Sequence, residues 1–224
     1  MTSTRLFICA GAIGLLMLGG CATKAPQYDY SAFQAAKPVS LLVLPPVNDS
    51  PEVKATAGAW AHATRPLAEA GYYVLPVTLV DETFRQNGMT GANEIQEISH
   101  QKLREVFGAD AAVYLKVKKY GTTYAVIASD TRVEVEGRII DLRTGAVLWQ
   151  GKAYASSAEQ QQQSSGGLVG LLVTALVNQI VGTASDAAFN FAGIANQRML
   201  GAPRYNGVLP GPRSPLHGQP PVAQ

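Results

Sequence analysis

The chain has 224 residues, of which 18 are Lys or Arg and 16 are Asp or Glu, so its formal net charge is +2. A charge so close to balance gives no electrostatic reason to expect nucleic acid as a partner. The length is sufficient for one domain with a buried core and tails, and the sequence contains no internal repeat.

The N-terminus has the pattern of a bacterial lipoprotein signal. Arg5 supplies a positive charge, residues 6–18 form a short apolar core, and the sequence LGGC at 18–21 places two small residues before Cys21. The apolar run is shorter than the roughly 20 residues that a membrane span needs, which is typical of a signal peptide. We predict that residues 1–20 are removed and that Cys21 becomes the acylated first residue of the mature chain.

Acylation of Cys21 would fix both the chemistry and the location of the mature chain. Two acyl chains, such as palmitate, are sufficient for stable membrane anchoring. Cys9 lies in the removed segment, so no disulfide, cysteine nucleophile or cysteine metal cluster is expected. Ala22, rather than an aspartate, follows the anchor. In a host with two membranes, this predicts attachment to the outer membrane on its periplasmic face.

The first half of the mature chain alternates short strands and helices. Residues 21–38 are predicted to form a lipidated tether that carries three aromatic residues. The apolar run 39–45 (VSLLVLP) predicts a strand buried on both faces. An alanine-rich helix is expected over 55–70, ending at Gly71 and kinked or restarted at Pro66.

Further elements follow before the sequence changes period. A strand is expected over 72–76, and Thr78 is expected to cap a short helix that Gly88 ends. One helix is then predicted from Asn93 to Phe107, with Gly108 as its terminator.

The second half has the alternating pattern of β-strands. Four strands are predicted, over 111–120, 123–129, 132–142 and 146–156. Gly137 interrupts the alternation and suggests a bulge, and Gly145 is expected to take positive φ in a turn over 141–145. The fold class that follows is an α/β sandwich whose mixed sheet becomes antiparallel toward its end, forming with the preceding elements one periplasmic domain over 39–200.

The region 160–185 contains no Asp, Glu, Lys or Arg, and it introduces an apolar helical stretch over 167–200. A second membrane segment is one interpretation, which the glycines of the sequence GGLVG at 166–170 support. Because Asn178 and Gln179 would fall in mid-span, we favour helices that pack on the sheet or in a subunit interface. The predicted homo-oligomer or partner interface consists of Leu171, Leu172, Leu176, Asn178, Gln179 and Ile180. The Pro- and Gly-rich tail 201–224 is predicted to be disordered.

No constellation of residues in the sequence predicts catalysis, a metal or a cofactor. His62, His100 and His217 lie far apart and do not have the spacing of metal ligands. The sequence contains no Gly-x-Ser-x-Gly elbow, and residues 145–152 lack the spacing and the hydroxyl of a phosphate-binding loop. We therefore predict a protein that is not an enzyme.

Three segments resemble a family of bacterial envelope lipoproteins of uncharacterised function. They are KPVSLLVLPPVNDSPEV, GYYVLPVTLVDETFRQNGMT and GLLVTALVNQI. The similarity covers about residues 28–200 and leaves the tail outside. The segment DLRTGAVLW at 141–149 is similar to CsgG-like, LpoB-like and TolB N-terminal-type domains. The resemblance implies an α/β domain of that group, and a CsgG-like lipoprotein and a second small lipoprotein as companions in an envelope complex.

The leading hypothesis is a lipid-anchored, non-enzymatic adaptor that assembles with partner lipoproteins in a secretion-like envelope complex. One alternative is a membrane-inserting or pore-lining component that uses residues 167–199. A second alternative is a cell-wall hydrolase whose site would be assembled by folding from His62, His100 and scattered acids.

Overall fold

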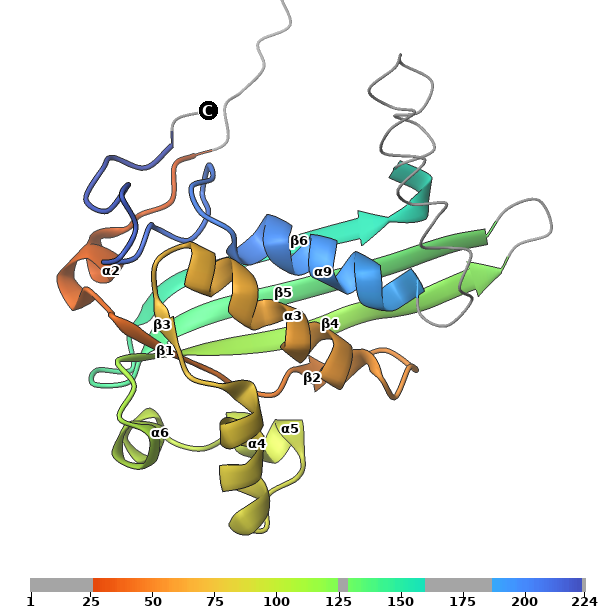
Figure 1. Cartoon of the computed structure of the whole chain (residues 1–224), viewed down its shortest axis with the longest axis horizontal. Helices are drawn as coiled ribbons and strands as arrows, with labels where there is room; N and C mark the ends of the chain where they lie inside the picture. Colours follow the sequence, from red (N-terminus) through yellow and green to blue (C-terminus); the bar gives the residue numbers. More distant parts are fainter. Residues whose placement is uncertain (1–25, 125–128, 160–186, 223–224) are drawn as a thin grey trace, which may run out of the picture.

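The computed structural model of the chain describes residues 26–124, 129–159 and 187–222. In these ranges, helices pack around one mixed β-sheet (Figure 1). The helices are α2 (Ser31–Ala36), α3 (Ala55–Glu69), α4 (Val77–Gln86), α5 (Ala92–Gln96), α6 (His100–Phe107) and α9 (Ala187–Leu200). The strands are β1 (Ser40–Val43), β2 (Val47–Asn48), β3 (Tyr73–Val74), β4 (Ala111–Tyr124), β5 (Ser129–Asp141) and β6 (Val147–Ser156).

The sheet has the order β3-β1-β4-β5-β6, with the short strand β2 also paired to β4. Strand β1 runs parallel to β3 and β4, whereas β4, β5 and β6 are antiparallel to one another. This confirms the predicted mixed sheet that becomes antiparallel toward its end. Leu41, Leu42 and Val43 of β1 are fully buried, as expected of a strand with both faces covered.

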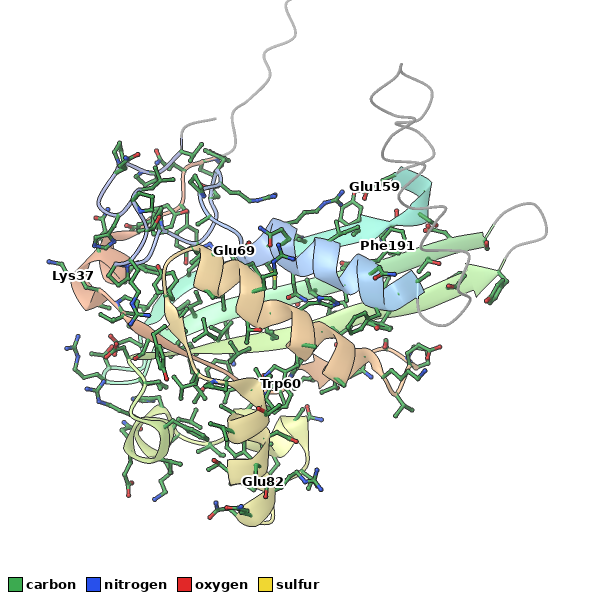
Figure 2. The ribbon with its side chains drawn as sticks, in the orientation of Figure 1. Lys37, Trp60, Glu69, Glu82, Glu159 and Phe191 are labelled. Atoms are coloured by element: carbon green, nitrogen blue, oxygen red, sulfur yellow. The ribbon has the colours of Figure 1, made fainter. Side chains whose placement is uncertain are left out.

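Two helices cover the same face of the sheet (Figure 1). Helix α3 contacts the parallel strands, while α9 contacts β4, β5, β6 and α3. Trp60 of α3, labelled in Figure 2, donates its indole N–H to the carbonyl of Val43 over 2.9 Å. Helix α9 buries Phe191 and Met199 against this core. The prediction that a C-terminal helix packs on the sheet is confirmed for 187–200, the part of it that the structure describes.

Helix α9 approaches the sheet closely over Gly137. Gly137 lies opposite Leu115 and Gly151 in the neighbouring strands. A Cβ atom at Gly137 would lie 3.1 Å from the terminal methyl of Met199 and 3.2 Å from a methyl of Leu115. The glycine therefore makes room for the helix, and the predicted bulge at this position is wrong. The register instead shifts between Val117 and Lys119, and at residues 139–140.

The turn over 141–145 is confirmed in detail. The Asp141 carboxylate accepts hydrogen bonds from the backbone N–H groups of Arg143, over 2.7 Å, and Thr144, over 2.8 Å. Gly145 has a φ of 78°, a conformation in which a side chain would be strained.

Two other elements differ from the sequence prediction. Where the structure describes the second half, it has three strands instead of four, because β4 continues to Tyr124 through Gly121, which pairs with β5 at a φ of 125°. The helix predicted over 93–107 is divided into α5 and α6. Ser99 causes the division, since its hydroxyl accepts the Lys102 backbone N–H and caps α6.

The helices at Pro66 and Pro76 also differ from the sequence prediction, in where they continue or begin. Helix α3 continues through Pro66 to Glu69 without a restart. Helix α4 begins at Val77, directly after Pro76, so Thr78 lies inside the helix and its side chain does not cap it. Proline suits this boundary because its fixed φ and missing N–H are tolerated at a helix start.

The predicted tether is shorter than residues 21–38. Tyr30 is 5% exposed and Phe33 is 3% exposed, and both belong to the hydrophobic core. Tyr30 directly precedes α2 and Phe33 lies within it, and α2 contacts β6. The aromatic side chains place this segment in the domain, because burying them removes a large apolar surface from water.

The tail is not disordered over 201–222, contrary to the prediction from its composition. Its backbone N–H groups at Gly211 and Arg213 donate to the carbonyls of Ala70, over 2.7 Å, and Gly71, over 3.1 Å. Val208 is 1% exposed and lies in the core. Proline and glycine do not prevent order where the backbone finds fixed partners, which the composition of the tail does not reveal.

Candidate functional site

The face of the antiparallel strands opposite α9 carries polar side chains. Successive residues of a strand point to opposite faces of the sheet. The residues on this face therefore alternate with the residues that are buried beneath α9. In the centre, Glu136 of β5 lies directly opposite Lys116 of β4 and Lys152 of β6. Cβ atoms of such opposed residues are about 5 Å apart. The three strands therefore present an acid between two lysines.

A second row of polar side chains crosses the strands beside the first. Arg138 lies opposite Tyr114 on one side and Gln150 on the other. The guanidinium of Arg138 is 5.0 Å from the centroid of the Tyr114 ring, a cation–π distance. Burial raises the pKa of the Tyr114 phenol, and the charge of Arg138 partly offsets that rise. The phenol therefore remains neutral at physiological pH.

A groove of about 580 Å³ lies over these rows, and α5 provides part of its wall. Gln96 of α5 donates from its side-chain amide to the carbonyls of Pro45 and Leu115, both over 2.9 Å. These bonds fix α5 at the rim of the sheet. The groove is lined by Gln96, Tyr114, Leu115, Lys116, Glu136, Gly137, Arg138, Gln150, Gly151 and Lys152. We call it the sheet groove.

The charge of the sheet groove is unbalanced toward the positive side. Three of its lining residues are cationic and one, Glu136, is acidic. Just outside it, Asp49 pairs with Lys118 over 2.6 Å and with Lys116 over 3.5 Å. The hydrogen bond from Lys118 holds the pKa of Asp49 below its usual value. A charged and open groove of this kind suits an anionic or polar protein surface better than an apolar small molecule.

The histidines that a hydrolase would use have different neighbours. His62 of α3 packs its ring against Phe189 of α9, with 4.2 Å between ring centroids. His100 of α6 lies beside Gly145 in the turn after β5. Across residues 26–124, 129–159 and 187–222, no three His, Cys, Asp or Glu side chains gather in a way that could hold a metal ion.

His62 predicts a dependence of stability on pH. Burial lowers the pKa of its imidazole, and a hydrogen bond with the Phe189 backbone only partly offsets that effect. The folded pKa therefore lies below the unfolded value of about 6.5, so the unfolded state takes up the proton first as the pH falls. The stability that His62 contributes is present above about pH 6.5 and is lost as the pH falls through the folded pKa.

We expect the free energy of unfolding to decrease from pH 7 to pH 5, and the decrease to be smaller in His62→Gln. Urea denaturation at the two pH values measures both changes. Equal decreases in the parent chain and in the variant would show that His62 does not cause the dependence.

The site residues predicted from the sequence lie outside the ranges that the structure describes. This applies to the lipidation site Cys21 and to the interface residues Leu171, Leu172, Leu176, Asn178, Gln179 and Ile180. Most of the region proposed to line a pore, 167–199, lies outside them as well. Among the helices that the structure does describe, none is both long and apolar enough to cross a membrane.

The sequence prediction missed the sheet groove. It did not single out Tyr114, Arg138 or Gln150 as residues that share a site. The alternation of polar residues in QGKAY, at 150–154, is the available signal. It shows which β6 side chains share a face, but it does not show what lies opposite them.

Comparison with known proteins identifies the family. The family described as "Putative lipoprotein GNA1162-like" matches residues 28–213. This match extends past Leu200, where the sequence prediction ended the similarity, and includes part of the ordered tail. A protein of Neisseria meningitidis serogroup B (strain ATCC BAA-335 / MC58), named "Putative lipoprotein NMB1124/NMB1162", is 43% identical over 204 residues, covering 91% of this chain and 94% of that protein.

A solved structure agrees with this result. The crystal structure of lipoprotein GNA1162 from Neisseria meningitidis has 45% sequence identity and a TM-score of 0.51, covering 65% of this chain and all of that chain. The LpoB C-terminal domain from Salmonella enterica is a more distant neighbour, with 17% identity and a TM-score of 0.38, covering 52% of this chain and 82% of that chain. The predicted resemblance to a family of bacterial lipoproteins is confirmed: the chain belongs to the GNA1162-like lipoprotein family.

Proposed function

We propose that the mature chain is anchored through lipidated Cys21 to the outer membrane, faces the periplasm, and acts as a non-enzymatic adaptor. The sheet groove is the surface on which it binds a partner protein of the envelope. A CsgG-like lipoprotein, the companion that the sequence resemblance implies, is the first candidate for this partner. The observation that carries the proposal is the arrangement of cationic and aromatic side chains on an open sheet face.

The composition of the groove supports a protein partner. Arginine and tyrosine are enriched at the centres of protein interfaces, where they combine apolar contact area with a polar end. On this face, Arg138 stacks on Tyr114, and Arg132 lies 4.5 Å from the ring centroid of Tyr154. Stacking restricts these long side chains before a partner arrives, so less conformational entropy is lost on binding.

The anchor would strengthen a weak contact at this face. A partner in the same membrane meets the tethered domain at a high effective concentration. A modest groove can therefore be occupied without a large interface. The second contact, which the sequence predicts through the apolar residues around Leu172 and Leu176, would add assembly of copies of the chain to binding of the partner.

Photo-cross-linking in the native host tests this function. The matched positions are Gln150, in the sheet groove, and Gln86, an exposed glutamine of α4. We expect a cross-linker at Gln150, but not at Gln86, to yield a discrete adduct with an envelope protein. Adding Arg138→Glu should reduce the yield at Gln150 about fivefold or more, because reversing a charge at an interface costs over 1 kcal/mol. Equal adducts at the two positions, or a yield unaffected by Arg138→Glu, would contradict the proposal.

A further inference from the structure

A second groove, of about 610 Å³, adjoins the sheet groove at β6, and the two share Gln150, Gly151 and Lys152 as lining residues. It is bordered by the strand, by the end of α9, by the tail and by the first residues that the structure describes. Its polar and charged lining includes Tyr28, Lys152, Arg198, Arg204, Tyr205 and Asn206. We call it the tether groove, because the chain leaves it toward Cys21.

Hydrogen bonds fix the N-terminal segment at this groove. The Tyr28 backbone N–H donates to the Asn206 side-chain oxygen over 2.8 Å, and the Asn206 side-chain amide donates to the Pro26 carbonyl over 3.0 Å. The Tyr30 hydroxyl donates to the Gly207 carbonyl over 2.6 Å. Asn206 itself is held by Trp149, whose indole N–H donates to its carbonyl over 3.0 Å. These hydrogen bonds therefore hold residues 26–30 against the tail residues that line the groove.

The distance from this groove to the lipid is limited by the length of the chain. Pro26 follows Cys21 by five positions. Even a fully extended backbone of that length spans only about 17 Å. With Cys21 acylated, Pro26, whose carbonyl is bonded to Asn206 in the groove lining, remains within that distance of the acylated residue. Helix α4 lies at the opposite end of the molecule from the first described residues in Figure 1, so the anchor does not hold it near the membrane in this way.

The charge of the tether groove matches an anionic surface. Lys152 and Arg204 are exposed, and the lining contains no Asp or Glu. Arg198 is partly neutralised, since it pairs with Glu159 over 2.8 Å and donates to the Tyr154 carbonyl. Asp29 lies outside the groove, where its carboxylate accepts the Ser31 backbone N–H over 2.9 Å. Two exposed cations, Lys152 and Arg204, therefore lie at the end of the domain nearest the lipid anchor, and Lys152 also lies opposite Glu136 of β5.

We propose that the tether groove binds the phosphate headgroups of anionic phospholipids. The two tyrosines at its rim, Tyr28 and Tyr205, have the amphipathic character of residues that lie at a membrane interface. Binding would orient the anchored domain with its N-terminal end against the bilayer. The proposal extends the proposed function, since it relies on the anchor at Cys21 to bring the groove to the membrane.

Vesicle binding by the full mature chain with Cys21→Ser tests the groove separately from the anchor. We expect co-sedimentation with vesicles of phosphatidylcholine and phosphatidylglycerol at low ionic strength, and little with phosphatidylcholine alone. Each cation near an anionic surface strengthens binding about fivefold. The double variant Lys152→Gln/Arg204→Gln should therefore bind about 25-fold more weakly. Both side chains are exposed, so the fold should remain, which thermal unfolding checks.

The control is Arg85→Gln/Lys102→Gln, which removes the same charge from exposed positions on α4 and α6. We expect at most a small loss in this control. Equal losses in the two double variants would mean non-specific attraction and would overturn the site. Loss of vesicle binding in millimolar inorganic phosphate, at constant ionic strength, would identify a free-phosphate site and would also overturn it. Because a chain carrying Cys21→Ser cannot be acylated, these results do not depend on lipidation, and failure of the cross-linking experiment would leave them unchanged.

Discussion

Truncation of the mature chain after Leu200 should lower its free energy of unfolding by roughly 3–5 kcal/mol. The tail accepts three side-chain hydrogen bonds from the core: from the Tyr30 hydroxyl, the Tyr72 hydroxyl over 2.7 Å, and the Trp149 indole N–H. It also covers the core with Val208. Without the tail, these donors lose fixed partners and the apolar surface beneath Val208 meets water.

Urea denaturation measures this effect, and a shorter truncation provides its control. Removing only residues 220–224 retains all these hydrogen bonds, as well as the backbone bonds from Gly211 and Arg213. We expect this control to unfold at the same urea concentration as the parent chain. If truncation after Leu200 also left the midpoint unchanged, the tail would contribute nothing to stability, as a disordered segment would.

The sequence predicted the tail poorly because composition describes the chain and not its partners. A segment of proline and glycine buries little surface by itself. Here the partners are backbone carbonyls at Ala70 and Gly71 and buried donors such as Trp149, which become available only after the sheet forms. The same reason explains why the tether was predicted to extend to residue 38. Phe33 finds its place in the core only beside residues far away in the sequence.

Periodicity was more informative for the elements themselves. The buried run of β1, the mixed sheet and the turn with Gly145 at its end follow from local patterns, and all three are confirmed. Glycine was ambiguous, however. In the sequence, a glycine that forms a bulge and a glycine that makes room for a helix look the same. The packing of Met199 against Gly137 shows that this glycine makes room for α9.

The sheet groove could be predicted only in part. The alternation in β5 up to Glu136 predicts which of its side chains share a face, but Arg138 joins that face only because no bulge forms at Gly137, and the side chains opposite depend on register. The register between β4 and β5 shifts between Val117 and Lys119, and no local pattern indicates that shift. The juxtaposition of Tyr114, Arg138 and Gln150 therefore had to come from the structure.

The anchor has the largest expected effect of any residue, since both the adaptor function and the orientation at the membrane depend on it. Cys21→Ser should transfer the protein from the membrane fraction to the soluble fraction almost completely, because the acyl chains supply most of the membrane affinity. The tether groove alone would retain little protein at physiological ionic strength, where charges are screened beyond about 8 Å. A matched Ser31→Ala variant should remain in the membrane fraction.

The intact mass of the mature protein, extracted in detergent from the native host, shows whether Cys21 carries the lipid anchor. We expect a chain that begins at residue 21 and exceeds its polypeptide mass by that of a diacylglyceryl group, with or without a third acyl chain. Fragmentation should place the added mass on Cys21. A mature chain with no lipid mass on its first residue, or a retained segment 1–20, would contradict lipid anchoring and would leave the proposed adaptor without its attachment to the membrane.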